Sequence, residues 1–192
     1  MHKSPSPEIG YMSRFEVLSA IGVTSLVLLV AAKVTLYVGQ MVLPAVIWSW
    51  QDLAIGLGLG LVIMLSSQLV YRFWPNYRKS ADFYLDQILA PLLWPDLIWL
   101  GLLPGLSEEL VFRGVLVGGL DYDLLGLFGA ALCFGLLHMS SAKQWPYALW
   151  AGIIGLMLGG GLILTSNLLV PIVAHIFCNL CSAIVWKWQH KS

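Results

Sequence analysis

The sequence Gly105-Leu-Ser-Glu108-Glu109-Leu-Val-Phe-Arg113-Gly114 places two adjacent carboxylates and one guanidinium within a long apolar region. Each charged side chain at the centre of a bilayer costs roughly 2.5–3.5 kcal/mol, so three that faced lipid would cost on the order of 8–10 kcal/mol. On a helix Glu109 and Arg113 are four residues apart and can neutralise each other, while Glu108 is turned about 100° away. The cluster is therefore expected to face a polar cavity, because a structural ion pair alone leaves one carboxylate unexplained.

The composition of the chain is that of an integral membrane protein. Of its 192 residues, 59% are hydrophobic and 10% are charged, whereas soluble domains carry about 25% charged residues. At about 20 residues per crossing plus loops, this length accommodates about six to eight transmembrane helices. The predicted fold class is all-α, a polytopic helical membrane protein in which residues 1–192 form a single transmembrane domain.

The charge pattern bears on two possible partners, nucleic acid and a lipid bilayer. The formal net charge is zero and the ten basic residues are scattered, which gives no support for nucleic-acid binding. The expected surroundings are a lipid bilayer, with a plasma membrane or a thylakoid-type membrane as the location.

Apolar runs mark the expected membrane segments. They cover residues 17–38, 53–73, 83–103, 124–138, 146–164 and 168–188. In the second run, Gly56, Gly58 and Gly60 are expected to permit a close helix contact. Cys178 and Cys181 form a CxxC pair inside the last run, where packing residues are favoured over a redox or zinc site.

The region before the acidic pair leaves the topology open. Pro91, Pro95 and Pro104 predict kinks in the third run. Ser107 can cap a new helix that extends to about residue 118, with both glutamates in its first turn, where the helix dipole favours carboxylates. If residues 83–119 form one kinked or re-entrant crossing, both termini and both basic loops lie on the cytoplasmic side. This arrangement agrees with the positive-inside rule better than a full crossing does.

Two histidines and an asparagine lie in later apolar segments. His138 ends the run that begins at Phe134, and His175 and Asn179 are four residues apart, so each pair shares a helical face. A lone histidine in an apolar helix is more often a satisfied core residue. Two histidines, an asparagine and two unexplained glutamates together favour convergence on one cavity.

These residue types suit hydrolysis, and they leave alternatives open. A glutamate can act as a general base towards water, an imidazole can hold the same water, and a His–Asn pair can donate hydrogen bonds to an oxyanion. Alternatively, Glu108, His138 and His175 supply three ligands for a zinc ion with an open fourth position, although the HExxH spacing of zinc proteases is absent. A nucleophilic route through Ser140 or Cys178 is weaker. Two non-hydrolytic alternatives are a small proton-coupled transporter and a non-catalytic membrane scaffold such as an immunity protein.

Three segments together resemble the motifs of one family, the CPBP intramembrane proteases, also called the Abi or CAAX-protease and bacteriocin-processing family. The patterns are EExxxR, FxxxH and HxxxN, each in an apolar segment and in that order. They correspond to Glu108-Glu-Leu-Val-Phe-Arg113, Phe134-Gly-Leu-Leu-His138 and His175-Ile-Phe-Cys-Asn179. The motif-bearing core covers about residues 92–188.

The resemblance implies an all-helical enzyme that cleaves a peptide bond of a membrane-associated peptide or protein substrate at membrane depth. By position it implies that Glu108 is the base acting on water and that Glu109 supports it. Arg113 would be the structural partner of the carboxylates, His138 would share the water, and His175 with Asn179 would form the oxyanion hole. The family is named as metalloproteases, whereas its type II CAAX prenyl endopeptidases, which act on prenylated substrates, have been interpreted as metal-free glutamate proteases. Zinc therefore remains an alternative.

Overall fold

The computed structural model describes residues 12–120 and 123–190, and within these ranges the chain contains helices and no strand. The α-helices are α1 (Arg14–Gly39), α2 (Trp50–Phe73), α3 (Pro75–Leu89), α4 (Leu97–Glu109), α5 (Leu124–Leu137), α6 (Trp145–Thr165) and α7 (Leu169–Gln189). The shorter segments are the 3-10 turns η1 (Trp94–Asp96), η3 (Gly118–Leu120) and η4 (Ala142–Gln144), and the π-helix η2 (Leu110–Val117). The predicted all-α fold is confirmed.

Among the described residues, four helical segments are long and apolar enough to cross a membrane: α1, α2, α6 together with η4, and α7. A fifth crossing would combine α3 with residues Trp94–Val117, which are bent relative to each other by 109°. The bend contains Pro91 and Pro95, where the sequence predicts a kink, and it suits a broken or re-entrant crossing. The protein is an integral multi-pass membrane protein. The seven α-helices of the described residues match the expected six to eight only when the shorter and bent helices are counted, since four or five segments are long enough to cross. The predicted side of the two termini concerns residues outside the described ranges.

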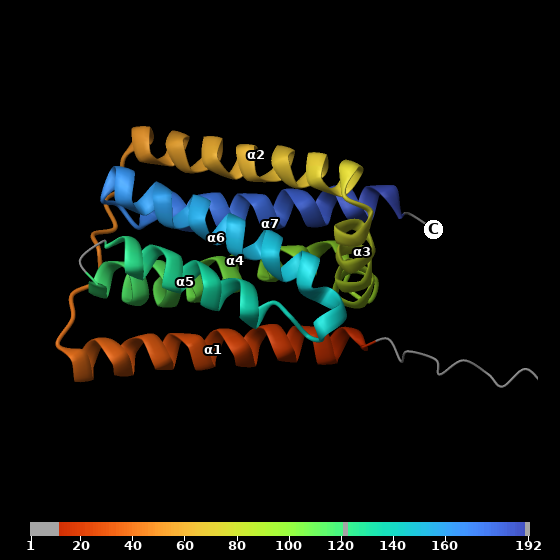
Figure 1. Cartoon of the computed structure of the whole chain (residues 1–192). Helices are drawn as coiled ribbons and strands as arrows, with labels where there is room; N and C mark the ends of the chain where they lie inside the picture. Colours follow the sequence, from red (N-terminus) through yellow and green to blue (C-terminus); the bar gives the residue numbers. More distant parts are fainter. Residues whose placement is uncertain (1–11, 121–122, 191–192) are drawn as a thin grey trace, which may run out of the picture.

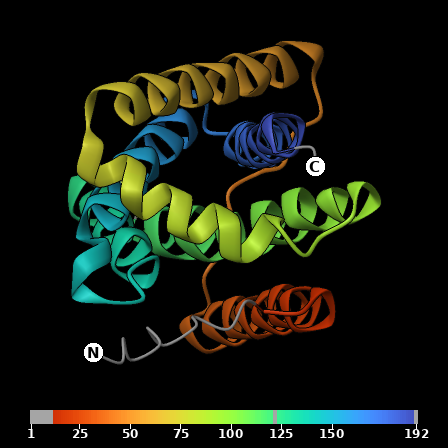
Figure 2. The same ribbon diagram turned by 90° about the vertical axis from the view of Figure 1, so that its right-hand side faces the viewer.

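The long helices lie in layers (Figure 1). The helix α2 forms one face, α6 and α7 follow, then α4 and α5, and α1 forms the opposite face. The helix α3 lies across the end of the bundle at which α7 ends, as the two views show together (Figures 1 and 2). Because α4 packs against α1 on one side and α7 on the other, its C-terminal end brings the two glutamates into the interior.

Two glycines allow α2 to approach α7 closely. A Cβ atom added to Gly56 would lie 2.9 Å from the carbonyl oxygen of Val170, and one added to Gly60 would lie 2.7 Å from that of Ala174. Nothing lies within 4 Å of such an atom at Gly58, so the predicted role of this third glycine is wrong. At 3.6 residues per turn, positions 56 and 60 share a face that position 58 does not.

Ser107 does not begin a helix, so the predicted N-cap is wrong. The helix α4 continues through Ser107 to Glu109 and on into η2, and the Ser107 hydroxyl donates to the carbonyl oxygen of Leu103 at 2.8 Å. Ser107 is fully buried, and a helix start at this depth would leave N–H groups that no water can satisfy. The glutamates therefore lie in mid-helix, where side chains rather than the helix dipole must balance their charge.

Candidate active site

The charged cluster forms where α4 passes into the π-helix η2. In a π-helix each N–H group bonds to the carbonyl five residues earlier, and such segments are rare and frequently occur at functional sites. The N–H of Gly118 bonds in this way to the carbonyl of Arg113. Arg113 lies in this segment, four residues after Glu109.

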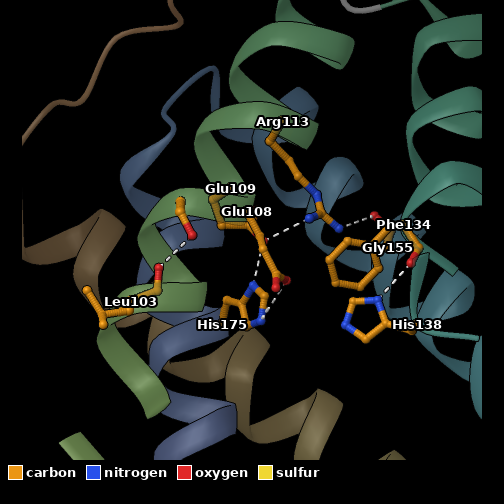
Figure 3. Close-up of polar contacts among 9 residues, drawn as sticks. Leu103, Glu108, Glu109, Arg113, Phe134, His138, Gly155 and His175 are labelled. Atoms are coloured by element: carbon orange, nitrogen blue, oxygen red, sulfur yellow. Dashed lines mark hydrogen bonds and ion pairs between the residues drawn. The ribbon is translucent and has the colours of Figure 1, made fainter. Parts of the chain in front are cut away.

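Glu109 and Arg113 form a buried ion pair, as their spacing predicts. Arg113 Nη1 donates to Glu109 Oε1 at 2.8 Å, and the two residues are 1% and 0% exposed. Arg113 Nη2 donates to the carbonyl oxygen of Gly155 at 3.1 Å, and the guanidinium carbon lies 4.7 Å from the ring centroid of Phe134 (Figure 3). Hydrogen bonds of this kind are what a buried pair requires to offset its loss of hydration.

His175 connects α7 to both carboxylates (Figure 3). Its Nδ1 donates to Glu109 Oε1 at 2.6 Å, and its Nε2 lies 3.9 Å from Glu108 Oε2. The imidazole is thus oriented by Glu109 and faces Glu108. Because Nδ1 already carries a hydrogen in this arrangement, donation from Nε2 requires a second hydrogen on the ring.

His138 is positioned by its own motif. It is the C-terminal cap residue of α5, and its Nδ1 lies 2.7 Å from the carbonyl oxygen of Phe134. A carbonyl only accepts, so Nδ1 carries the hydrogen and Nε2 of the neutral ring is free to accept one. The ring centroids of Phe134 and His138 are 4.4 Å apart. The FxxxH spacing therefore fixes both the orientation and the tautomer of this imidazole.

One cavity joins the motifs. Its volume is about 530 Å³, and its lining includes Glu108 from α4, His138 after α5, and His175 and Asn179 from α7. A smaller cavity of about 90 Å³ shares His138, His175 and Asn179 with it. Four of the six predicted site residues thus line a common space, and the other two, Glu109 and Arg113, are buried beside His175.

Two carboxylate oxygens at this site are unsatisfied. Glu108 Oε2 and Glu109 Oε2 are buried, and no hydrogen-bond donor among the described residues reaches them. Leaving a buried acceptor unpaired is unfavourable. Since Glu108 lines the cavity, its free oxygen is a place where a water molecule or a substrate N–H group can bind.

The zinc alternative requires three ligand atoms within about 2 Å of one point. Among the described residues, no group of three His, Cys, Asp or Glu side chains is placed to hold a metal ion. The predicted set of Glu108, His138 and His175 therefore does not form a metal site in this arrangement. Because this arrangement does not fit the ion, no step below is routed through a metal. Metal analysis of the purified protein checks this alternative.

Two further residues at the site were not predicted from the sequence, and a third, Cys178, is predicted there only as a packing residue or a weaker nucleophile. The carbonyl of Gly155 accepts from Arg113, and a Cβ atom there would lie 3.1 Å from Ala131 Cα; the glycine-rich sequence of α6 is the one signal for it. Tyr147 lines both cavities, with its ring centroid 6.3 Å from that of His138. Cys178 lines both cavities as a free thiol.

Comparison with known proteins finds a similarity in the region that carries the motifs. A family model described as type II CAAX prenyl endopeptidase Rce1-like matches residues 90–181, which contain all three motifs. This part of the chain is similar to the Rce1-like family. The Rce1-like match supports a CAAX-protease-type intramembrane peptidase in general terms, and the role of each site residue remains a prediction.

The chain is also similar to a curated bacterial protein. It is 27% identical over 147 residues to the protein described as "Uncharacterized protein YpbD" of Bacillus subtilis (strain 168), and the match covers 75% of each chain. No solved structure matches the chain. The Rce1-like region and the arrangement of its side chains therefore carry the functional argument.

Proposed function

We propose that this protein is an intramembrane endopeptidase that hydrolyses a peptide bond of a membrane-associated substrate. The observation that carries the proposal is the shared cavity. Glu108, His138, His175 and Asn179 come from three helices, and all four line one space inside an apolar bundle. Ionisable side chains at such a depth mark functional sites by default, and the Rce1-like match gives the reaction class.

In the proposed reaction, a water molecule binds between Glu108 and His138. Glu108 removes a proton as the water oxygen attacks the scissile carbonyl carbon. Nε2 of His138 accepts a hydrogen bond from the remaining O–H group. The carbonyl oxygen becomes an oxyanion, to which the Asn179 amide and the Nε2–H group of a doubly protonated His175 donate hydrogen bonds. The proton then passes from Glu108 to the amide nitrogen and the C–N bond breaks, which gives a carboxylic acid and an amine. Transfer of the acid's proton to the amine yields a carboxylate and an ammonium group as the products.

Glu109 and Arg113 act as positioning residues in this scheme. Glu109 Oε1 holds His175 through Nδ1, and Arg113 neutralises Glu109 while it is itself held by Gly155. The pair thus fixes which nitrogen of His175 faces the cavity. This division of labour accounts for the presence of two adjacent glutamates.

The test is cleavage of membrane-anchored peptides, prenylated ones included, by the full-length protein in lipid nanodiscs. Glu108→Gln keeps the size of the side chain and removes the base, so we expect the rate to fall by roughly 10²–10⁴-fold. Glu16→Gln on α1, which is exposed and outside the cavity lining, is the matched control and should retain the wild-type rate. Undiminished cleavage by Glu108→Gln, with products identified by mass spectrometry, would refute the proposal.

A further inference from the structure

The cavity that reaches Glu108 extends beyond the motif core. Its lining includes residues of α1, α2 and α3, none of which carries a motif. The lining is mixed: α1, α3 and α4 contribute apolar side chains such as Ile21 and Leu100, while Tyr71 of α2 and Asp82 of α3 are polar. A peptide that reaches Glu108 therefore meets apolar side chains from several helices and polar groups at Tyr71 and Asp82.

Asp82 is the second carboxylate in this lining, and it is oriented. The Tyr71 hydroxyl donates to Asp82 Oδ1 at 2.7 Å, while Oδ2 accepts no hydrogen bond from any residue in the described ranges. None of the ion pairs formed by these residues involves Asp82. The guanidinium of Arg78 lies over the Tyr71 ring, 5.9 Å from its centroid, and this exposed side chain is not part of the lining. One Asp82 oxygen is thus fixed and the other is available.

Apart from the histidines, the charged side chains of the lining have one sign. Glu108 and Asp82 are present, and no lysine or arginine occurs among the described residues that line the cavity. A cleft lined by one sign of charge concentrates its field and favours ligands of the opposite sign. A substrate carboxylate, such as a free C-terminus, meets no lysine or arginine here, whereas a lysine or arginine side chain of the substrate meets Asp82.

We propose that Asp82 is a specificity-determining residue that binds a basic side chain, lysine or arginine, of the substrate. The assignment rests on the proposed function, because it concerns the same cavity. A charge-assisted hydrogen bond to Asp82 Oδ2 places the basic residue against α2 and α3. Neighbouring apolar residues of the substrate then pack against α1 and α4, and the peptide extends towards Glu108.

The probes are membrane-anchored peptides that differ at one position, which carries Lys, Gln or Glu and is moved one residue at a time along the segment outside the anchor. At one position, the wild-type protein in nanodiscs should cleave the Lys peptide about tenfold faster than the Gln peptide. Asp82→Asn should cleave both at the wild-type Gln rate, and Asp82→Lys should prefer Glu. Asp86→Asn removes the same charge one turn along α3, outside the lining, and should keep the preference for Lys.

Equal rates for Lys and Gln at every position, or an unchanged preference in Asp82→Asn, would overturn this assignment and leave the proposed function intact. If Asp82→Asn cleaves nothing, fluorescence anisotropy of the labelled Lys peptide decides: weaker binding than by the wild type supports the assignment, and equal binding overturns it. If the wild type cleaves no peptide, the proposed function fails, and the same binding comparison decides the role of Asp82 separately.

Discussion

Glu109 Oε1 accepts hydrogen bonds from two elements at once. Arg113 Nη1 reaches it from η2 at 2.8 Å, and His175 Nδ1 reaches it from α7 at 2.6 Å. The same atom therefore balances a buried cation and sets the orientation of an imidazole in the cavity. A change at either partner is expected to affect both stability and the site.

Arg113→Met keeps an apolar chain of similar length and leaves Glu109 as a buried charge with one fewer donor. Removing one partner of a buried pair costs roughly 3–5 kcal/mol, whereas replacing both by apolar residues is often neutral. We expect a loss of that size in the free energy of unfolding, measured by denaturant titration in detergent. The double variant Glu109→Leu/Arg113→Met should recover much of the stability and remain inactive. A loss below about 1 kcal/mol for Arg113→Met would show that the pair is not buried as described.

The sequence predicts part of this cluster. The four-residue spacing is sufficient to pair Glu109 with Arg113, since it holds on any helical segment. The bond from Glu109 to His175 spans 66 positions, and the acceptor for Arg113 Nη2 is a backbone carbonyl on α6. Neither contact leaves a local pattern, because each depends on how whole helices pack.

Among the elements, α2 and α7 are in close contact where Gly60 faces Ala174, the residue before His175. The contact is therefore adjacent to the site. It is specific to one face of α2, since Gly58 meets nothing within 4 Å.

Gly60→Ala places a methyl group 2.7 Å from the carbonyl oxygen of Ala174, so the two helices must move apart. Overpacking of this kind typically costs about 1–3 kcal/mol. We expect lower thermal stability and a lower cleavage rate, because the backbone at His175 shifts relative to Glu108. Gly58→Ala is the matched control and should retain both properties. Equal behaviour of the two variants would contradict the described packing.

At this scale the sequence locates helices better than it locates their ends. Apolar runs identify α1, α2, α6 and α7 closely, because lipid requires long continuous apolar segments. Ser107 misleads, since its preference for cap positions is a local property that burial of the backbone overrides. The π-helical winding of η2 has no counterpart in an apolar pattern either.

Over the whole molecule, residues far apart in the sequence line one cavity. Glu108, His138 and His175 occupy three helices, and α1 to α3 complete the walls. The motifs predict that these residues converge, because separate polar groups in lipid are unfavourable. They do not predict the walls, since Tyr71 and Asp82 are ordinary polar residues until the fold places them beside the cavity.

The central claim is that Glu108 and His138 act on the same water molecule, and a double-mutant cycle tests it most directly. Cleavage rates are measured for the wild type, Glu108→Gln, His138→Ala and the double variant in nanodiscs. Residues that act as a unit give strongly non-additive losses, so we predict a double variant no more than about tenfold slower than the slower single variant. Rate losses that multiply in full, or substantial activity in Glu108→Gln, would contradict the account.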